Sequence, residues 1–243
     1  MTDIAVSLYY EVMKYDPHYP AWPERDRFVL SKGHGALCLY AILADVGFYP
    51  PEELESYGKL GSPFGWHPNM HKNPGVDMST GSLGHGLSAS VGMALAGRSE
   101  GARWRVYCLL GDGELHEGTV WEAAMSASQF GLGNLVAVID RNQYCSDGAT
   151  EDIMGLEPLA DKWRSFGWNT RETDGHDMES ILETFAALPA PDSKAPNCII
   201  ASTIKGRGVS FMEGRFEWHY GGLDEDKGAE AIADIEAARP GRG

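Results

Sequence analysis

Two polar residues follow two apolar runs of the chain at corresponding places. Asp112 stands in the turn Gly111-Asp112-Gly113 after the run Trp104–Leu110, and Asn142 comes thirty residues later, after the run Leu135–Asp140. The intervening residues hold one helical and one strand-like segment, and a right-handed β-α-β crossover places the two strand ends side by side. A carboxylate, an amide oxygen and a loop carbonyl would then converge, which is a ligand set suited to Mg²⁺ or Ca²⁺.

The same residues have a purely structural interpretation. A lone Gly-Asp-Gly is a weak signal because many tight turns use it, and Asp112 and Asn142 are both residue types favoured in turns and helix caps. The paired spacing favours the metal site over this alternative. The chain carries a net charge of −15, so a phosphate ligand would need local help from a metal, backbone N–H groups or a helix N-terminus.

The elements that must position these residues alternate in the second half of the chain. The runs are continuously apolar, as expected for strands covered by helices on both faces, and strands that alternate with helices indicate a parallel sheet. We therefore predict an α/β fold with a doubly wound, mainly parallel sheet and helices on both faces, whose ligands bind at the carboxyl ends of the strands. The predicted strands are 104–110, 135–140, a short one near residue 169, and 198–204; the helices are 119–130, 159–166 and 178–188.

The first half supplies fewer regular elements. The spacing of apolar residues predicts helices over 3–13, 34–46 and 84–98, and a short strand over 27–30. Pro51 followed by two glutamates predicts another helix start. Residues 58–83 are rich in Gly, Pro, Asn and Ser and include His67 and His71. A loop of this length in a compact chain is usually functional.

Composition excludes several classes of protein. The 243 residues hold 20 Lys+Arg against 35 Asp+Glu, which argues against a nucleic-acid partner. The longest apolar stretch, 36–44, is far short of the ~20 residues of a membrane span, and the first residues lack the basic region of a signal peptide. The four cysteines show no C-x-x-C spacing and predict reduced thiols in a cytoplasmic protein. We expect a single domain over 1–243 that ends in an acidic tail, 224–243.

Several motifs, in order, resemble the N-terminal half of transketolase. They are RFVLSKGHGALCLYAIL, STGSLGHGLSASVGMALA, GDGELHEGTVWEAAMSASQF and TIKGRGVSFMEG followed by WH. The pairing of G-D-G with Asn thirty residues later is similar to the thiamine diphosphate motif. The resemblance covers residues 5–222 and is greatest to the small, separately encoded N-terminal subunit of split bacterial transketolases. It implies the thiamine diphosphate-binding fold and its diphosphate-binding domain.

The resemblance also implies a cofactor site. Asp112, Asn142 and the backbone carbonyl of Tyr144 match ligands of a metal, Mg²⁺ or alternatively Ca²⁺ or Mn²⁺, that holds the diphosphate of thiamine diphosphate. The backbone of Gly113 matches a contact to that diphosphate. The implied cofactor-binding set also includes Gly81, Ser82 and Leu83, of which Gly81 and Leu83 line the aminopyrimidine. Its other members are Gly111, Glu114, His34, His67 and His219.

Four residues match catalytic positions of the family. His34, His67 and His219 match histidines that face diphosphate, thiazolium and substrate, and Glu117 matches an acid that couples to a glutamate of the partner. Glu117 has the alternative role of an acid in the first turn of a helix. Lys205 and Arg207 suit either a substrate phosphate or a solvated basic patch, and the other histidines suit surface or core positions: His18, His71, His85, His116 and His176.

The resemblance implies an incomplete enzyme. We expect transfer of a two-carbon ketol unit between sugar phosphates, with the pyrimidine-binding domain on a partner chain, the C-terminal transketolase subunit, and a heterotetramer with two copies of each. The alternatives are a subunit similar to deoxyxylulose-phosphate synthase or to the alpha chain of a 2-oxo acid dehydrogenase, or a non-catalytic cofactor-binding subunit. The family's G-H-P-G turn has no counterpart here, so either Met1 is not the true start or the chain is a truncated or degenerate form.

Overall fold

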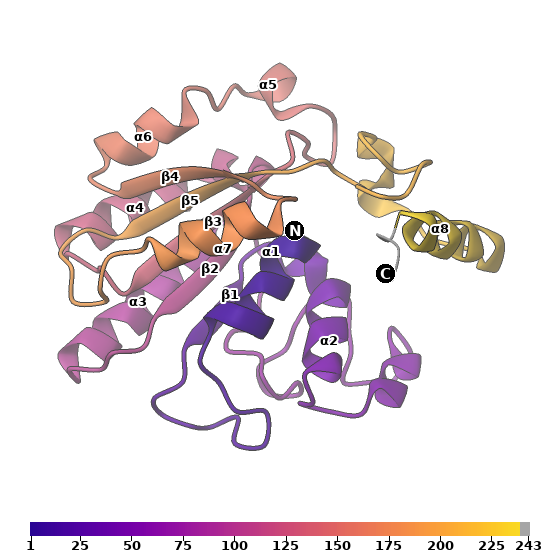
Figure 1. The fold of residues 1–243 in the computed structure, drawn as a ribbon, viewed down its shortest axis with the longest axis horizontal. Helices are drawn as coiled ribbons and strands as arrows, with labels where there is room; N and C mark the ends of the chain where they lie inside the picture. Colours follow the sequence, from indigo (N-terminus) through magenta and orange to yellow (C-terminus); the bar gives the residue numbers. More distant parts are fainter. Residues whose placement is uncertain (239–243) are drawn as a thin grey trace.

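The computed structural model describes residues 1–238 and has a sheet of five parallel strands at its centre (Figure 1). The strand order is β1-β2-β3-β5-β4. The three interior strands, β2, β3 and β5, are almost wholly buried, as their continuous apolar runs require. The bounds are β1 Arg27–Leu30, β2 Val106–Gly111, β3 Leu135–Arg141, β4 Asn169–Asp174 and β5 Asn197–Ser202.

Helices cover both faces of this sheet. Alternate strand residues point to opposite faces, so Tyr107 and Leu109 pack with one group of helices while Cys108 and Leu110 pack with the other. The first group is α1 Thr2–Ser7, α2 Ala36–Asp45 and α7 Met178–Ala186; the second is α3 His85–Ser99, α4 Gly118–Gln129 and α6 Leu159–Ser165. The predicted doubly wound α/β fold is confirmed.

Shorter helical segments connect these elements. The last long helix, α8, lies beside the carboxyl ends of the strands, apart from both helical layers (Figure 1). The bounds are η1 Leu8–Val12, η2 Gly33–Gly35, η3 Pro51–Ser56, η4 Gly113–His116, α5 Thr150–Ile153, η5 Phe216–Tyr220 and α8 Glu225–Ala237.

The differences from the predicted elements are local. The helix predicted over 3–13 is an α-helix that continues as a π-helical turn, η1. The helix start at Pro51 becomes the six-residue 3-10 helix η3. The one-turn helix α5 was not predicted because it lies in the loop after β3, where the apolar periodicity gives no signal. Within the predicted tail 224–243, α8 is helical, and 239–243 lie outside the described residues.

Strand register brings the predicted metal ligands together. Gly111 of β2 pairs with Asp140 of β3, so Asp112 and Asn142 leave the sheet at the same edge. This is the juxtaposition that the β-α-β argument predicts. Among residues 1–238, none of the helices has both the length and the apolar character needed to cross a membrane.

Candidate cofactor-binding site

Asp112 lies just beyond β2 and is 1% exposed. Its Oδ1 accepts a hydrogen bond from the Gly113 N–H at 2.8 Å, and its Oδ2 accepts from the Gln143 N–H at 2.5 Å and from Nη1 of Arg141 at 3.1 Å. Burial raises the pKa of Asp112, although these donors oppose the shift. Oδ2 is therefore held by two donors from the end of β3 and the segment after it. Oδ1 accepts one hydrogen bond and keeps a lone pair for a further ligand.

Asn142 and Tyr144 follow β3 in a sharply turned segment. The Asn142 Nδ2 donates to Oδ2 of Asp140 at 3.2 Å, and its Oδ1 accepts from the Tyr144 N–H at 3.1 Å. Gln143 between them has a φ of +68°, the left-handed region that non-glycine residues rarely adopt. The Thr150 N–H donates to the Gln143 carbonyl at 2.9 Å. The Tyr144 carbonyl accepts no backbone hydrogen bond within this turn.

The oxygens of Asp112, Asn142 and the Tyr144 carbonyl are of the type that binds a hard divalent cation. One carboxylate, one amide oxygen and one carbonyl are oxygen ligands of the kind that Mg²⁺ and Ca²⁺ take. Within residues 1–238 no group of three or more His, Cys, Asp or Glu side chains could hold a metal alone. A cation here would thus need oxygens from a bound ligand and water, which suits a metal that bridges the protein and a phosphate.

A cavity of about 560 Å³ opens beside these donors at the carboxyl edge of the sheet. Asn142 lines it together with Lys32, His34, Lys205 and His219. The cavity is lined by three basic side chains, those of Lys32, Lys205 and Arg207, against the two carboxylates of Asp3 and Asp140. This leaves a local excess of positive charge in a chain of net charge −15. Such a region favours an anionic ligand.

His34 and His219 lie together in this cavity although they are far apart in the sequence. Their ring centroids are 5.0 Å apart. Partial burial lowers the pKa of each to about 4, with Lys32 contributing next for His34 and Lys205 next for His219. Both rings are therefore neutral at pH 7. The Lys205 Nζ lies 3.2 Å from Nδ1 of His219, and since an ammonium only donates, the proton of this imidazole is on Nε2.

His67 is brought to the glycine-rich segment that was predicted to line the cofactor. A Cβ built on Gly81 would lie 3.1 Å from Cδ2 of His67, so the ring packs against the bare backbone there. A Cβ on Gly33 would lie 2.7 Å from the Gly81 nitrogen. The turn before His34 therefore packs against the same glycine segment as His67. Ser82 is exposed and Leu83 is half-buried beside them.

Glu114 connects three of the motifs through its buried carboxylate. Its Oε1 accepts from the Ser31 hydroxyl and from the Gly84 N–H at 2.8 Å, and its Oε2 accepts from the Gly111 N–H at 3.1 Å. Both oxygens are engaged by protein donors. Any cofactor contact of Glu114 would therefore come from its backbone, and its place in the binding set stays a prediction.

Glu117 stands at the N-cap of α4 with its side chain exposed. The side chain makes no capping hydrogen bond, so the structure gives no support to a capping role. Its Cβ packs against the turn at Gly84, where a built Cβ would approach it to 2.7 Å. Its role toward a partner stays a prediction.

Sequence reasoning missed three buried charged side chains at this edge. Lys32 and Asp140 form an ion pair of 2.5 Å, and Arg141 contacts the carboxylates of Asp112, Glu151 and Glu157. The position of Asp140 near the end of an apolar strand is a signal that could have indicated the first pair. The contacts of Arg141 cross a loop and leave no trace in the spacing.

His176 lines the cavity but has no free nitrogen for a ligand. Its Nδ1 pairs with Asp3 and its Nε2 accepts from the Ile204 N–H.

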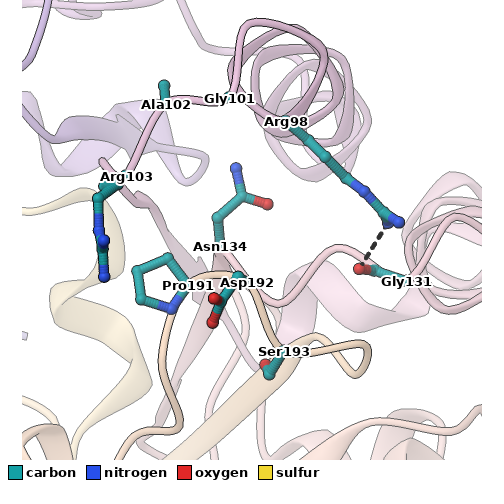
Figure 2. A pocket seen from close by; sticks show the side chains of 9 residues that line it. All are labelled: Arg98, Gly101, Ala102, Arg103, Gly131, Asn134, Pro191, Asp192 and Ser193. Carbon is teal, nitrogen blue, oxygen red and sulfur yellow. Dashed lines mark hydrogen bonds between the residues drawn. The ribbon is translucent and has the colours of Figure 1, made fainter.

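A second cavity, of about 290 Å³, lies at the amino edge of β3 (Figure 2). It contains no residue of the predicted site, and its Arg98 donates to the Gly131 carbonyl at 2.8 Å.

The chain is similar to known proteins over nearly its whole length. The profile of the family described as "Transketolase, thiamine diphosphate binding domain" matches residues 1–235. A 6-deoxy-6-sulfo-D-fructose transketolase subunit from Clostridium sp. (strain MSTE9) is 45% identical over 96% of this chain and 85% of the relative. An apulose-4-phosphate transketolase subunit from Phocaeicola vulgatus is 42% identical over 96% and 82%. The crystal structure of Pichia stipitis transketolase with sedoheptulose-7-phosphate superimposes with a TM-score of 0.89 at 30% identity over 96% of this chain. This chain covers 36% of that structure, about a third of its length.

Proposed function

Because the chain belongs to the family of transketolase thiamine diphosphate-binding domains, we propose that it is the cofactor-anchoring subunit of a split transketolase. In this proposal it takes part in moving a two-carbon ketol unit from a ketose phosphate to an aldose phosphate. The observation that carries the proposal is that the Gln143 N–H joins Asp112 to the segment that holds Asn142 and Tyr144. Asn142 lines a cavity that is also lined by lysines and histidines.

The residues of this chain would bind the diphosphate end. Asp112, Asn142 and the Tyr144 carbonyl would hold Mg²⁺, or Ca²⁺ or Mn²⁺ in its place, and the Gly113 backbone would contact the diphosphate. Thiamine diphosphate supplies the nucleophilic carbon that carries the two-carbon unit. Lys205 and Arg207 line the same cavity and would add positive charge where the anion would lie, whereas Lys32 is paired with Asp140. Gly81, Ser82 and Leu83 would line the aminopyrimidine.

Three histidines would handle protons near the reacting carbon. His34 and His219 are neutral at pH 7 because burial and the lysines lower their pKa to about 4. His219 then presents Nε2–H as a hydrogen-bond donor to a substrate oxygen, since Lys205 occupies Nδ1. His67 would complete the set, and the rings would position substrate hydroxyls as well as exchange protons with them.

The second half of the active site would come from another chain. The relatives named above are subunits, and this chain spans about a third of a complete transketolase. We therefore propose a C-terminal subunit with the pyrimidine-binding domain as the partner, Glu117 facing it, and two copies of each chain in a heterotetramer. The four cysteines are all free, which suits a reducing compartment such as the cytoplasm.

Calorimetry tests this proposal. Thiamine diphosphate and Mg²⁺ are titrated into this chain alone and into its mixture with the C-terminal subunit encoded in the same genome. We expect weak binding alone, tight binding in the mixture, and ketol transfer by the mixture only. Binding in the mixture without ketol transfer would indicate a non-catalytic cofactor-binding subunit, and absence of binding in both samples would overturn the proposal.

A further inference from the structure

We propose that Asp140 is a positioning residue that aims Oδ1 of Asn142 toward the metal ion. The inference rests on the proposed function, because it concerns how one ligand of that metal is oriented. Asp140 would not touch the metal or the diphosphate. It would act through Asn142, supported from behind by Lys32 and Thr203.

The Asp140 carboxylate is held on both oxygens. It is 3% exposed. Its Oδ2 accepts from Nζ of Lys32 at 2.5 Å and from Nδ2 of Asn142 at 3.2 Å. Its Oδ1 accepts from the Thr203 hydroxyl at 2.6 Å and from the amino group of Met1 at 3.2 Å. A rotation of this carboxylate would break several hydrogen bonds away from water, so its orientation is well determined.

A fixed carboxylate selects one orientation of the neighbouring amide. An asparagine side chain has a donor end and an acceptor end of nearly the same size, and an ionised carboxylate only accepts. Asp140 therefore binds the NH₂ end of Asn142 and turns Oδ1 the other way, where it accepts from the Tyr144 N–H at 3.1 Å. The flipped amide would place its oxygen against the carboxylate and its NH₂ group toward the cation.

Lys32 supports the acceptor role of Asp140 that this selection needs. Its Nζ lies 2.5 Å from Oδ2 of Asp140 in a buried ion pair, and a carboxylate in an ion pair only accepts hydrogen bonds. The lysine reaches this place by passing close to Gly111, where a built Cβ would lie 3.4 Å from Cδ of Lys32. The absence of a side chain at Gly111 thus leaves room for the Lys32 side chain.

A purely structural role is the competing explanation, since a buried ion pair also holds the sheet edge together. Asp26 offers a matched control. It is a buried aspartate, 6% exposed, that accepts from the backbone N–H groups of Lys14 at 2.8 Å and Arg105 at 2.7 Å. It lies just before β1, at the amino edge of the sheet, and does not line the 560 Å³ cavity.

The test measures Mn²⁺ binding rather than turnover. Free Mn²⁺ is followed by electron paramagnetic resonance as it is titrated, with thiamine diphosphate, into the full chain combined with the C-terminal subunit. We expect Asp140→Asn to weaken Mn²⁺ binding about 10- to 100-fold, the usual effect of losing a residue that orients a metal ligand. Thr203→Val, which keeps the ion pair and removes one hydroxyl donor, should weaken binding by a smaller factor. Asp26→Asn should leave Mn²⁺ affinity unchanged.

An exchange of the two side chains separates orientation from packing. In Asp140→Asn combined with Asn142→Asp, the ligand at position 142 is a carboxylate with two equivalent oxygens, so it needs no orienting partner. We expect this double variant to bind Mn²⁺ more tightly than Asp140→Asn. Loss of general packing predicts instead that the second substitution restores nothing.

Each outcome decides between the two proposals. Wild-type protein that binds no Mn²⁺ with thiamine diphosphate would overturn the proposed function, and the role of Asp140 with it. Wild-type binding with equal affinity in Asp140→Asn, or an equal loss in Asp26→Asn, would overturn the positioning role alone. If Asp140→Asn does not fold, Thr203→Val decides, and an unchanged Mn²⁺ affinity in that variant would reject the inference.

Discussion

The backbone N–H of Gln143 donates a 2.5 Å hydrogen bond to Oδ2 of Asp112, and so joins the segments that follow β2 and β3. Gln143 adopts a φ of +68° to make this bond. A left-handed conformation costs a non-glycine residue about 1–2 kcal/mol. Local strain is thus located between two proposed metal ligands, Asn142 and Tyr144, where strained backbone often accompanies function.

Substitution at Gln143 should reveal this strain. Gln143→Gly keeps the N–H and relieves the strain, so we expect a free energy of unfolding unchanged or higher by up to about 1 kcal/mol. Gln143→Val, whose branched side chain tolerates this region poorly, should lower it by about 1–2 kcal/mol. Urea unfolding of both variants measures the difference. A less stable glycine variant would contradict the account.

Removal of the carboxylate at Asp112 should abolish metal-dependent cofactor binding. Asp112→Asn removes the only anionic member of the proposed ligand set. In either orientation of the amide, its NH₂ group faces a donor, namely the Gly113 N–H or the donors of Gln143 and Arg141. We expect the affinity for thiamine diphosphate with Mg²⁺ to fall at least about 100-fold, and stability to fall by about 1–3 kcal/mol. Calorimetry checks the affinity, with the exposed Asp147→Asn as control. Equal losses in both variants would indicate a non-specific effect.

Acid should destabilise the chain through His34 and His219. Their pKa falls from 6.5 to about 4 on folding, so between these values the unfolded chain binds more protons than the folded one. Stability is then lost as the pH decreases from 6.5 toward 4, and these groups contribute nothing to pH dependence above that window. The double variant His34→Gln, His219→Gln should show a shallower loss in urea unfolding between pH 7 and 4. The exposed His18→Gln should follow the wild type.

Two glycines near Asp112 should respond oppositely to alanine. A Cβ at Gly113 would lie 2.7 Å from Cβ of Cys145, so Gly113→Ala should displace the loop after β3 and weaken cofactor binding. A Cβ at Gly118, the first residue of α4, has no atom within 4 Å. Gly118→Ala should therefore stabilise the chain by about 0.5–1 kcal/mol. Thermal unfolding compares the stabilities of the two variants. A Gly118→Ala variant less stable than the wild type would show that a Cβ at this position is not tolerated.

The parts of the site that follow from chain topology were predictable. The carboxyl ends of β2 and β3 must be neighbours after a β-α-β crossover, so Asp112 and Asn142 were expected together. The pairing of His34 with His219 has no comparable rule, because η5 reaches the cavity through a loop after β5 whose course is set by tertiary packing. The resemblance to transketolases suggested those histidines, and spacing alone would not have done so.

Side-chain contacts across loops were the least predictable part. Arg141 reads as an ordinary strand-end residue, yet it contacts three carboxylates and the Thr150 hydroxyl. Likewise, nothing in the sequence indicated that the carboxylate of Glu114, a residue predicted to lie at the cofactor, binds groups of Ser31, Gly84 and Gly111. Both cases depend on rotamers and loop conformations that the order of residue types does not specify.

The three attachments of Glu114 also constrain how such a chain can change over evolutionary time. One carboxylate satisfies donors from the ends of β1 and β2 and from the turn before α3. Loss of that carboxylate would leave buried N–H groups without acceptors, a cost of about 1–3 kcal/mol for each. A substitution at position 114 would therefore require compensating changes near Ser31, which is 83 residues away in the sequence, and near Gly84, which is 30 residues away. These motifs should vary together among descendants rather than independently.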